Sequence, residues 1–169
     1  PARAGSRRWV LPFRRLGRHD EDHVGTHHVS PLVEMRRRSG WDLRLMEVVQ
    51  THRRQPFAWG AYDCATFFND AVDAVAGFRP LVAHMPWDSE QAAARRLIAA
   101  GYRDMAEFCR TFFPEIPPAH ARRGDVGFAD VRHALSCPAV IVGAEAVTRT
   151  ESGWLTLPAC LLVQCFKIG

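Results

Sequence analysis

The sequence predicts an α+β protein in which helices come first and a mostly antiparallel sheet follows. Between residues 41 and 113, apolar residues recur at helical spacing in several segments that end near Gly or Pro. After Arg123, short runs rich in Val, Ile, Leu and Thr are separated by Gly, Pro and Ser, as in strands joined by turns. Helices followed by strands are the order of an α+β fold, so we expect N-terminal helices packed on a sheet of about five strands.

Four helices are expected, and local signals mark their ends. An apolar stripe that begins at Trp41 stops before Pro56. Asp63 is a suitable N-cap for the second helix, and Gly77 can adopt the left-handed conformation that ends it. The expected ranges are 41–54, 63–76, 88–100 (with Asp88 or Ser89 as the cap) and 104–113. The second helix has an apolar face that needs a partner, so we expect it to lie against the sheet.

The five expected strands are short and rich in β-branched residues. Their ranges are 125–131, 139–142, 146–150, 154–157 and 161–168. Turn residues separate them, which favours antiparallel neighbours joined by hairpins.

Residues 1–40 differ in composition from the rest of the chain. They hold nine Arg and four acidic residues, a net charge of +5, whereas the whole chain carries +4. The basic character therefore belongs to this segment, which we expect to be an irregular tail ahead of a domain at 41–169. A basic arm that binds nucleic acid is one alternative, although nucleic acid is not the partner we expect. A metal site in the His/Asp run at 19–28 is another, but the run fits no strong ligand spacing.

The composition excludes several classes of protein. An apolar fraction of 47% is ordinary for a globular domain, and no run of about 18 apolar residues is present to span a membrane. The Arg-rich start lacks the continuous apolar segment of a secretion signal. The five cysteines include no CxxC pair, which argues against a disulfide framework or a structural zinc site and favours a reducing compartment. We expect no metal and no cofactor.

The clearest chemical motif is Pro56-Phe57-Ala58-Trp59-Gly60-Ala61-Tyr62-Asp63-Cys64. It predicts a tight Trp-Gly turn, then an N-cap at Asp63, then a thiol in the first helical turn. Backbone N–H groups and the helix dipole favour a thiolate there, the form that attacks carbonyl carbons. Cys64 is therefore the candidate nucleophile, and Trp59, Tyr62 and Asp63 are candidate substrate-binding residues. The alternative interpretation is that Cys64 is a small apolar residue packed at a helix start.

This motif resembles that of the NlpC-type cysteine peptidases, which have a papain-like α+β fold and cut peptide stems of bacterial cell walls. That family shows Pro-Tyr-x-Trp-Gly-Gly, Asp-Cys-Ser-Gly, Gly-Asp-Leu and a His-Val-Gly-Ile-Tyr strand. The corresponding segments here are 56–60, 63–64, 124–126 and 139–143, with Ala-Thr where Ser-Gly is usual. Residues 41–45 and 153–158 are similar to motifs of a divergent branch found in phages, prophages and gene-transfer-like particles.

One position departs from the family pattern. Counting back from Gly143 places Cys137 where the family has its His, and the third polar member would fall near Thr148. His133 is the nearest His in sequence and the candidate acid/base. More distant candidates are His120 and His52. We expect Cys137 to fill the core, and the alternative is a second thiol close enough to pair with Cys64.

The resemblance implies a thiol peptidase or amidase that acts on cell-wall peptide and is carried by a phage tail or a related particle. Cys64 would attack the amide carbon, and its N–H together with Tyr62 would stabilise the oxyanion. The alternative is an inactive scaffold that docks onto a tail-tip or baseplate protein, because a thiol without a base is not activated. The expected location is the virion tail, or the bacterial cytoplasm during assembly.

Overall fold

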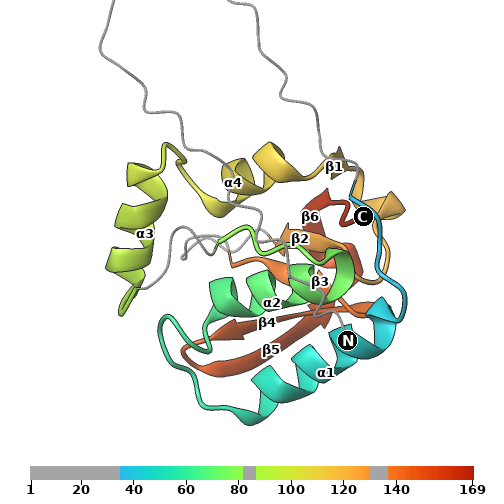
Figure 1. Cartoon of the computed structure of the whole chain (residues 1–169), viewed down its shortest axis with the longest axis horizontal. Coiled ribbons are helices and arrows are strands. Elements are labelled where there is room, and N and C mark those ends of the chain that lie inside the picture. The colour runs from blue at the N-terminus through green and yellow to red at the C-terminus, as the bar shows by residue number, and fades with distance from the viewer. Residues whose placement is uncertain (1–34, 82–86, 130–136) are drawn as a thin grey trace, which may run out of the picture. The chain divides into compact units, whose positions relative to one another are not determined.

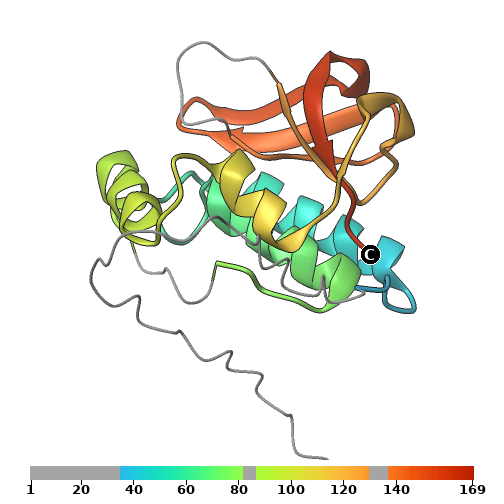
Figure 2. The same cartoon turned by 90° about the horizontal axis from the view of Figure 1, so that it is seen from above.

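A computed structural model of the chain describes residues 35–81, 87–129 and 137–169. These residues belong to one compact unit. It consists of a layer of helices on one face of an antiparallel sheet (Figures 1 and 2), which confirms the expected α+β class. Within the described ranges, no helix is both long enough and apolar enough to cross a membrane.

The helices begin and end where local signals predict. Their bounds are α1 Trp41–Arg54, α2 Cys64–Ala76, α3 Glu90–Ala99 and α4 Met105–Phe112. The side chains of Asp63, Ser89 and Asp104 each accept a hydrogen bond from a backbone N–H in the first turn of the helix that follows. Gly77 ends α2 with a φ of 72°, so both expected boundaries of that helix are confirmed.

The sheet has six described strands, and every neighbouring pair is antiparallel, in the order β1-β6-β2-β3-β4-β5. The bounds are β1 Glu115–Ile116, β2 Val126–Ala129, β3 Ala139–Ile141, β4 Glu145–Thr150, β5 Gly153–Pro158 and β6 Leu162–Phe166. The five expected strands are β2 to β6, and residues 130–131 of the first lie outside the described residues. The sequence analysis missed β1, a two-residue edge strand paired with β6.

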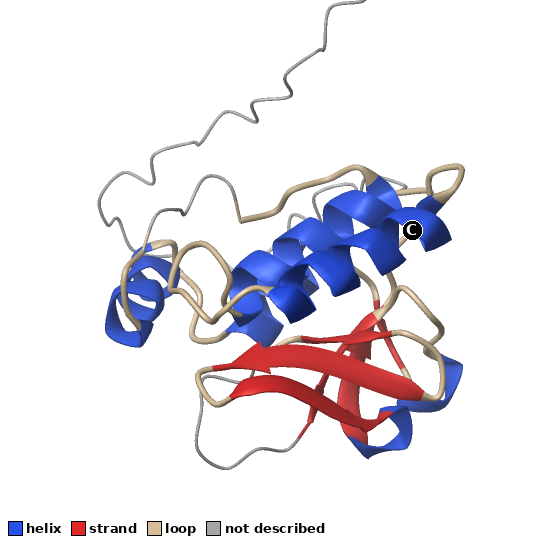
Figure 3. Ribbon diagram, turned by 90° about the horizontal axis from the view of Figure 1, so that it is seen from below, coloured by secondary structure: helices blue, strands red, loops and turns tan. Residues whose placement is uncertain are grey.

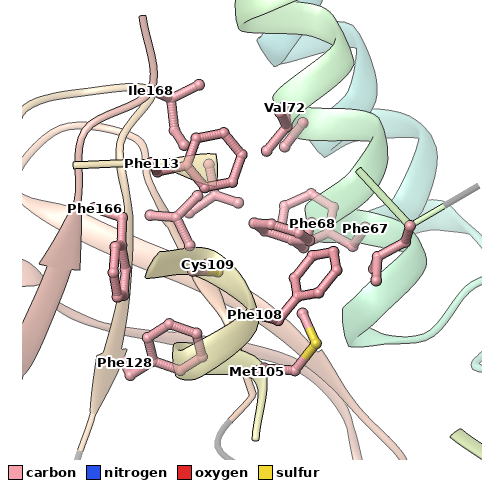
Figure 4. Packing of buried hydrophobic residues seen from close by; sticks show 14 of the residues in the cluster. Phe67, Phe68, Val72, Met105, Phe108, Cys109, Phe113, Phe128, Phe166 and Ile168 are labelled. Atoms are coloured by element: carbon pink, nitrogen blue, oxygen red, sulfur yellow. The ribbon is translucent and has the colours of Figure 1, made fainter. Parts of the chain in front are cut away.

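The main core lies between the helices and the sheet (Figure 3). Phe67 and Phe68 of α2 meet Phe108 of α4 and the strand residues Phe128 and Phe166 (Figure 4). All five rings are at most 2% exposed. Each buried ring contributes roughly 1.5–3 kcal/mol relative to an exposed one. Helix α2 packs against β3 and β4, as its apolar face predicts.

Residues 36–38, which the sequence analysis assigns to the N-terminal tail, include two residues that contact the folded domain. The Arg37 guanidinium donates to the Ile168 and Arg123 carbonyls and to Asp125, at 3.0, 2.7 and 2.7 Å. The backbone N–H of Arg38 also donates to the Val75 carbonyl. These contacts hold the segment before α1 against the C-terminal end of the chain.

Candidate functional site

The turn before α2 requires a glycine at position 60. Gly60 has a φ of 72°, and a Cβ placed there would lie 2.2 Å from the backbone oxygen of Trp87. The Tyr62 N–H donates to the Ala58 carbonyl at 2.7 Å and closes the turn. The predicted Trp-Gly turn is therefore confirmed. It also brings the segment before α3 against the start of α2.

Asp63 organises this corner of the molecule from a position that is 0% exposed. One carboxylate oxygen accepts a hydrogen bond from the Thr66 N–H at 2.7 Å. The other accepts from the Gly60 N–H and from the indole N–H of Trp87. The Thr66 hydroxyl accepts from the Asp63 N–H in return, which completes a capping box. These four hydrogen bonds hold the first turn of α2, where Cys64 lies, in place.

Cys64 lies on the wall of a cleft of about 270 Å³. Cys137, two residues before β3, contributes a second thiol to the same cleft, and the two thiols interact closely enough to shift each other's pKa. Both thiols are half-buried. The walls are mainly apolar, and charged groups come from α3 and from the turn after β4. The other lining residues are Phe57, Trp59, Ala65, Leu81, Trp87, Glu90, Ala93, Ala94, Arg96, Leu97, Met105, Pro138, Thr150 and Glu151.

The interaction between the two thiols shifts their pKa values in opposite directions. It raises the pKa of Cys64 well above its usual value, and burial, Cys137 and Asp63 act in the same direction. The backbone N–H at Cys64 opposes this shift and is outweighed. The same interaction lowers the pKa of Cys137, against burial and the carboxylates of Glu90 and Asp63. The helix start therefore acts on Cys64 in the expected direction, but it does not set the pKa of this thiol.

Comparison with known families places most of the chain in one of them. Residues 36–168 match the family described as a domain of unknown function (DUF6950). The chain belongs to this family. No curated protein matches it. The DUF6950 match begins at residue 36, beside Arg37, whose contacts hold the segment before α1 to the domain.

The DUF6950 cleft includes one of the three expected substrate-binding residues. Trp59 lines the cleft, and its indole N–H donates to Glu151 at 3.1 Å. Tyr62 is not among the lining residues, and its ring packs edge-on against His52 with the centroids 5.4 Å apart. Asp63 is buried behind the cleft wall, where its carboxylate is occupied by the hydrogen bonds of the cap. Asp63 therefore supports the helix start that carries Cys64 and does not face the cleft.

None of the histidines that the structure describes lies on the cleft. His133, the candidate acid/base, lies outside the described residues. His52 is 2% exposed and pairs with Asp70 at 3.0 Å. His120 is an exposed residue of the 3₁₀ turn Pro118–His120. Neither of these two lines the cleft.

Cys137 is the residue whose surroundings the sequence analysis judged wrongly. It was expected to fill the core, yet it is half-buried and faces the cleft beside Cys64. Its position six residues before Gly143 was the available signal. The Thr148 hydroxyl, near the position where the resemblance to NlpC-type peptidases predicts a third polar member, donates to the Pro138 carbonyl at 2.8 Å. Thr148 therefore fixes the backbone next to Cys137.

The cleft offers thiol chemistry. Among residues 35–81, 87–129 and 137–169, no group of three or more His, Cys, Asp or Glu side chains is placed to hold a metal ion. The cleft presents one thiol at a helix start, a second thiol beside it, and a largely apolar wall with Glu90, Arg96 and Glu151 among its members.

Proposed function

We propose that this DUF6950 protein is a thiol-dependent peptidase or amidase that acts on bacterial cell-wall peptide, with a papain-like fold of the NlpC type. The observation that carries the proposal is the position of Cys64. Its thiol lies in the first turn of α2 and lines a cleft, beside a turn of the form Trp-Gly-x-x-Asp-Cys. The sequence resemblance adds the substrate class and the association with a phage tail or gene-transfer-like particle.

The reaction would proceed through a thioester. The Cys64 sulfur attacks the amide carbon, the C–N bond breaks, and the amine leaves with a proton from the acid/base group. Water then attacks the thioester, which releases the acid and returns the proton to sulfur. The Cys64 N–H, at the start of α2, is the oxyanion donor that the fold supports. His133 remains the predicted acid/base residue.

The lining of the cleft suits a short peptide that carries charged groups. Phe57 and Trp59 offer flat apolar surface for side chains, while Arg96 can pair with a carboxylate and Glu90 with an amine. Cell-wall stem peptides carry both kinds of group. We therefore propose that the peptide binds along the wall formed by α3 and approaches Cys64 at the start of α2.

A second candidate function is an inactive scaffold that docks onto a tail-tip or baseplate protein through the same cleft. Two observations favour it. The pKa of Cys64 is raised, and neither described histidine lines the cleft. A thiol that holds its proton at neutral pH and has no base beside it attacks amides slowly.

Incubation of the reduced full chain with purified peptidoglycan tests the two candidates. We expect wild-type protein to release soluble fragments whose masses and new amino ends identify one cleaved bond. Cys64→Ala should release none, and Cys64→Ser should release at most traces because serine is a weaker nucleophile here. His133→Ala should remove activity if His133 is the base.

Cys160→Ser serves as the matched control, because Cys160 is exposed in the 3₁₀ turn Ala159–Leu161 and does not line the cleft. Its activity should equal that of wild type. Release of the same fragments by Cys64→Ala would contradict the enzymatic proposal. A folded wild-type protein that releases nothing from several peptidoglycan types would leave the scaffold as the function.

A further inference from the structure

We propose that Cys64 and Cys137 are a reversible disulfide site, which makes the cleft a thiol–disulfide centre as well as a candidate hydrolase site. The two thiols come from different parts of the fold, the start of α2 and the segment before β3, and they line one cleft, in which they interact with each other.

These two cysteines differ from the other three in the combination of contact and access. Cys109 and Cys165 are 0% exposed within the core. Cys160 is exposed on the surface. Only Cys64 and Cys137, both half-buried, line the cleft, where a small reagent can reach them. We therefore expect oxidation to link Cys64 to Cys137.

The surrounding structure holds both residues in place before any bond forms. Asp63 and Thr66 fix the turn that carries Cys64. On the other side, Thr148 fixes Pro138, the residue next to Cys137. A disulfide at these positions would cross-link the start of α2 to the segment before β3, two parts of the chain that are far apart in sequence.

The oxidant we name is a low-molecular-weight disulfide such as oxidised glutathione. The Cys137 thiolate attacks one sulfur of this reagent and forms a mixed disulfide, and one thiol leaves. The Cys64 sulfur then attacks the Cys137 sulfur and displaces the second thiol. Two protein thiols lose two electrons and two protons, and one external disulfide is reduced to two thiols. The lowered pKa of Cys137 makes it the thiol that attacks first.

Oxidation would remove the nucleophile of the proposed hydrolase, because a sulfur in a disulfide cannot attack an amide carbon. This regulatory consequence rests on the proposed function. The disulfide itself does not, since thiol mapping requires no cell-wall substrate. Conversely, the peptidoglycan assay uses reduced protein and requires no disulfide, so failure of one proposal is distinguishable from failure of the other.

Treatment of the full chain with oxidised glutathione, followed by alkylation and non-reducing tryptic mapping, tests the site. Trypsin leaves Cys64 in peptide 55–95, Cys109 in 104–110 and Cys137 in 133–149, whereas Cys160 and Cys165 share 150–167. We expect a linked 55–95/133–149 product. Iodoacetamide labelling of Cys64 in native protein should fall by about tenfold or more on oxidation and return with dithiothreitol.

Two variants complete the design. Cys160→Ser should form the same linked peptide, because Cys160 takes no part in the pair. Cys137→Ser should form no link to Cys64 and should leave Cys64 free or bound to glutathione. The proposal is overturned if wild-type protein accumulates glutathione on Cys64 or Cys137 without linking them, if peptide 150–167 is the linked partner, or if both thiols remain free at high concentrations of oxidised glutathione.

Discussion

Two regions of the molecule place a buried carboxylate beside a cysteine. They differ in the partners of the carboxylate and in the access to the thiol. Asp63 lies next to Cys64 at the start of α2, and Asp125 lies beside Cys165 of β6. Asp63 accepts hydrogen bonds from uncharged donors, and none of the ion pairs in the described part of the chain involves it. Asp125 pairs with Arg37 at 2.7 Å and accepts from the Ile168 N–H.

The comparison shows what makes one cysteine a candidate for chemistry. Burial and the Asp125 carboxylate raise the pKa of Cys165 to about 11. Cys137, then burial and the Asp63 carboxylate, raise the pKa of Cys64 well above its usual value. In the Asp125 region the thiol is inaccessible to reagents, because Cys165 is 0% exposed. The Asp63 region adds a cleft and a second thiol whose pKa is lowered. We infer that reactivity depends on Cys137 and on access, rather than on the helix start by itself.

The largest effect is expected from Asp63→Ala. It leaves the Gly60, Thr66 and Trp87 N–H donors without their acceptor. Loss of a cap together with buried unpaired donors should lower the free energy of unfolding by about 4 kcal/mol. Urea-induced unfolding followed by Trp fluorescence and by far-UV circular dichroism measures the change.

Asp104→Ala is the matched control for Asp63→Ala. Asp104 caps α4 in the same way and accepts from the Glu107 N–H, so its loss should cost about 1 kcal/mol, the ordinary value for an N-cap. If both variants lost the same free energy, Asp63 would be an ordinary cap, and the hydrogen bonds to Gly60 and Trp87 would add nothing.

A smaller effect is expected from Arg37→Ala in the Asp125 region. Its guanidinium makes three hydrogen bonds, but its side chain is 23% exposed, so solvent compensates part of the loss. We expect the free energy of unfolding to fall by about 2 kcal/mol. Arg37→Lys should recover little, because an ammonium group cannot reproduce the planar fork.

The exposed Arg44 of α1 supplies the control for Arg37. Arg44→Ala should change stability by less than about 0.5 kcal/mol, the usual range for a surface position. If Arg37→Ala and Arg44→Ala had the same free energy of unfolding, Arg37 would not stabilise the domain, and residues 36–38 would belong to the tail expected from composition.

The range over which a signal acts decides how much of this structure the sequence predicts. The caps Asp63, Ser89 and Asp104 each act on a residue three positions away, so the sequence shows them directly. Arg37 contacts residues 86 to 131 positions away, and no local pattern indicates such partners. Strand β1 has two residues, too few to show alternation.

The candidate site also contains features that are local in sequence, which could be predicted, and features that are not. The turn, the cap and the helix start around Cys64 were predicted because they are contiguous in sequence. The wall of the cleft was not, because α3 and the turn after β4 supply Glu90, Arg96 and Glu151. For Cys137 the sequence position was informative but its burial was misjudged, since the residue precedes the buried run of β3 and is not part of it.

A still smaller effect on stability is expected from Thr148→Val. This change keeps the shape and removes the hydroxyl that donates to the Pro138 carbonyl at 2.8 Å. A buried acceptor that loses one partner should lower the free energy of unfolding by about 1 kcal/mol. Thr148→Ser keeps the donor and should retain most of the hydrogen-bond contribution. If Val and Ser at this position were equally stable, the hydroxyl would not hold the backbone beside Cys137.

The smallest expected effect tests whether the two cleft thiols share a hydrogen. The measurement is the pH dependence of iodoacetamide labelling of the tryptic peptides that contain Cys64 and Cys137. Below its pKa a thiol reacts in proportion to its thiolate fraction, so a pKa lower by one unit gives about tenfold faster labelling at fixed pH. Cys137→Ala removes the largest cause of the raised pKa of Cys64, so the Cys64 profile should move to lower pH. Cys64→Ala removes the bond that lowers the pKa of Cys137, so that profile should move to higher pH. Opposite shifts require a shared hydrogen, because simple loosening of the cleft would speed both reactions together.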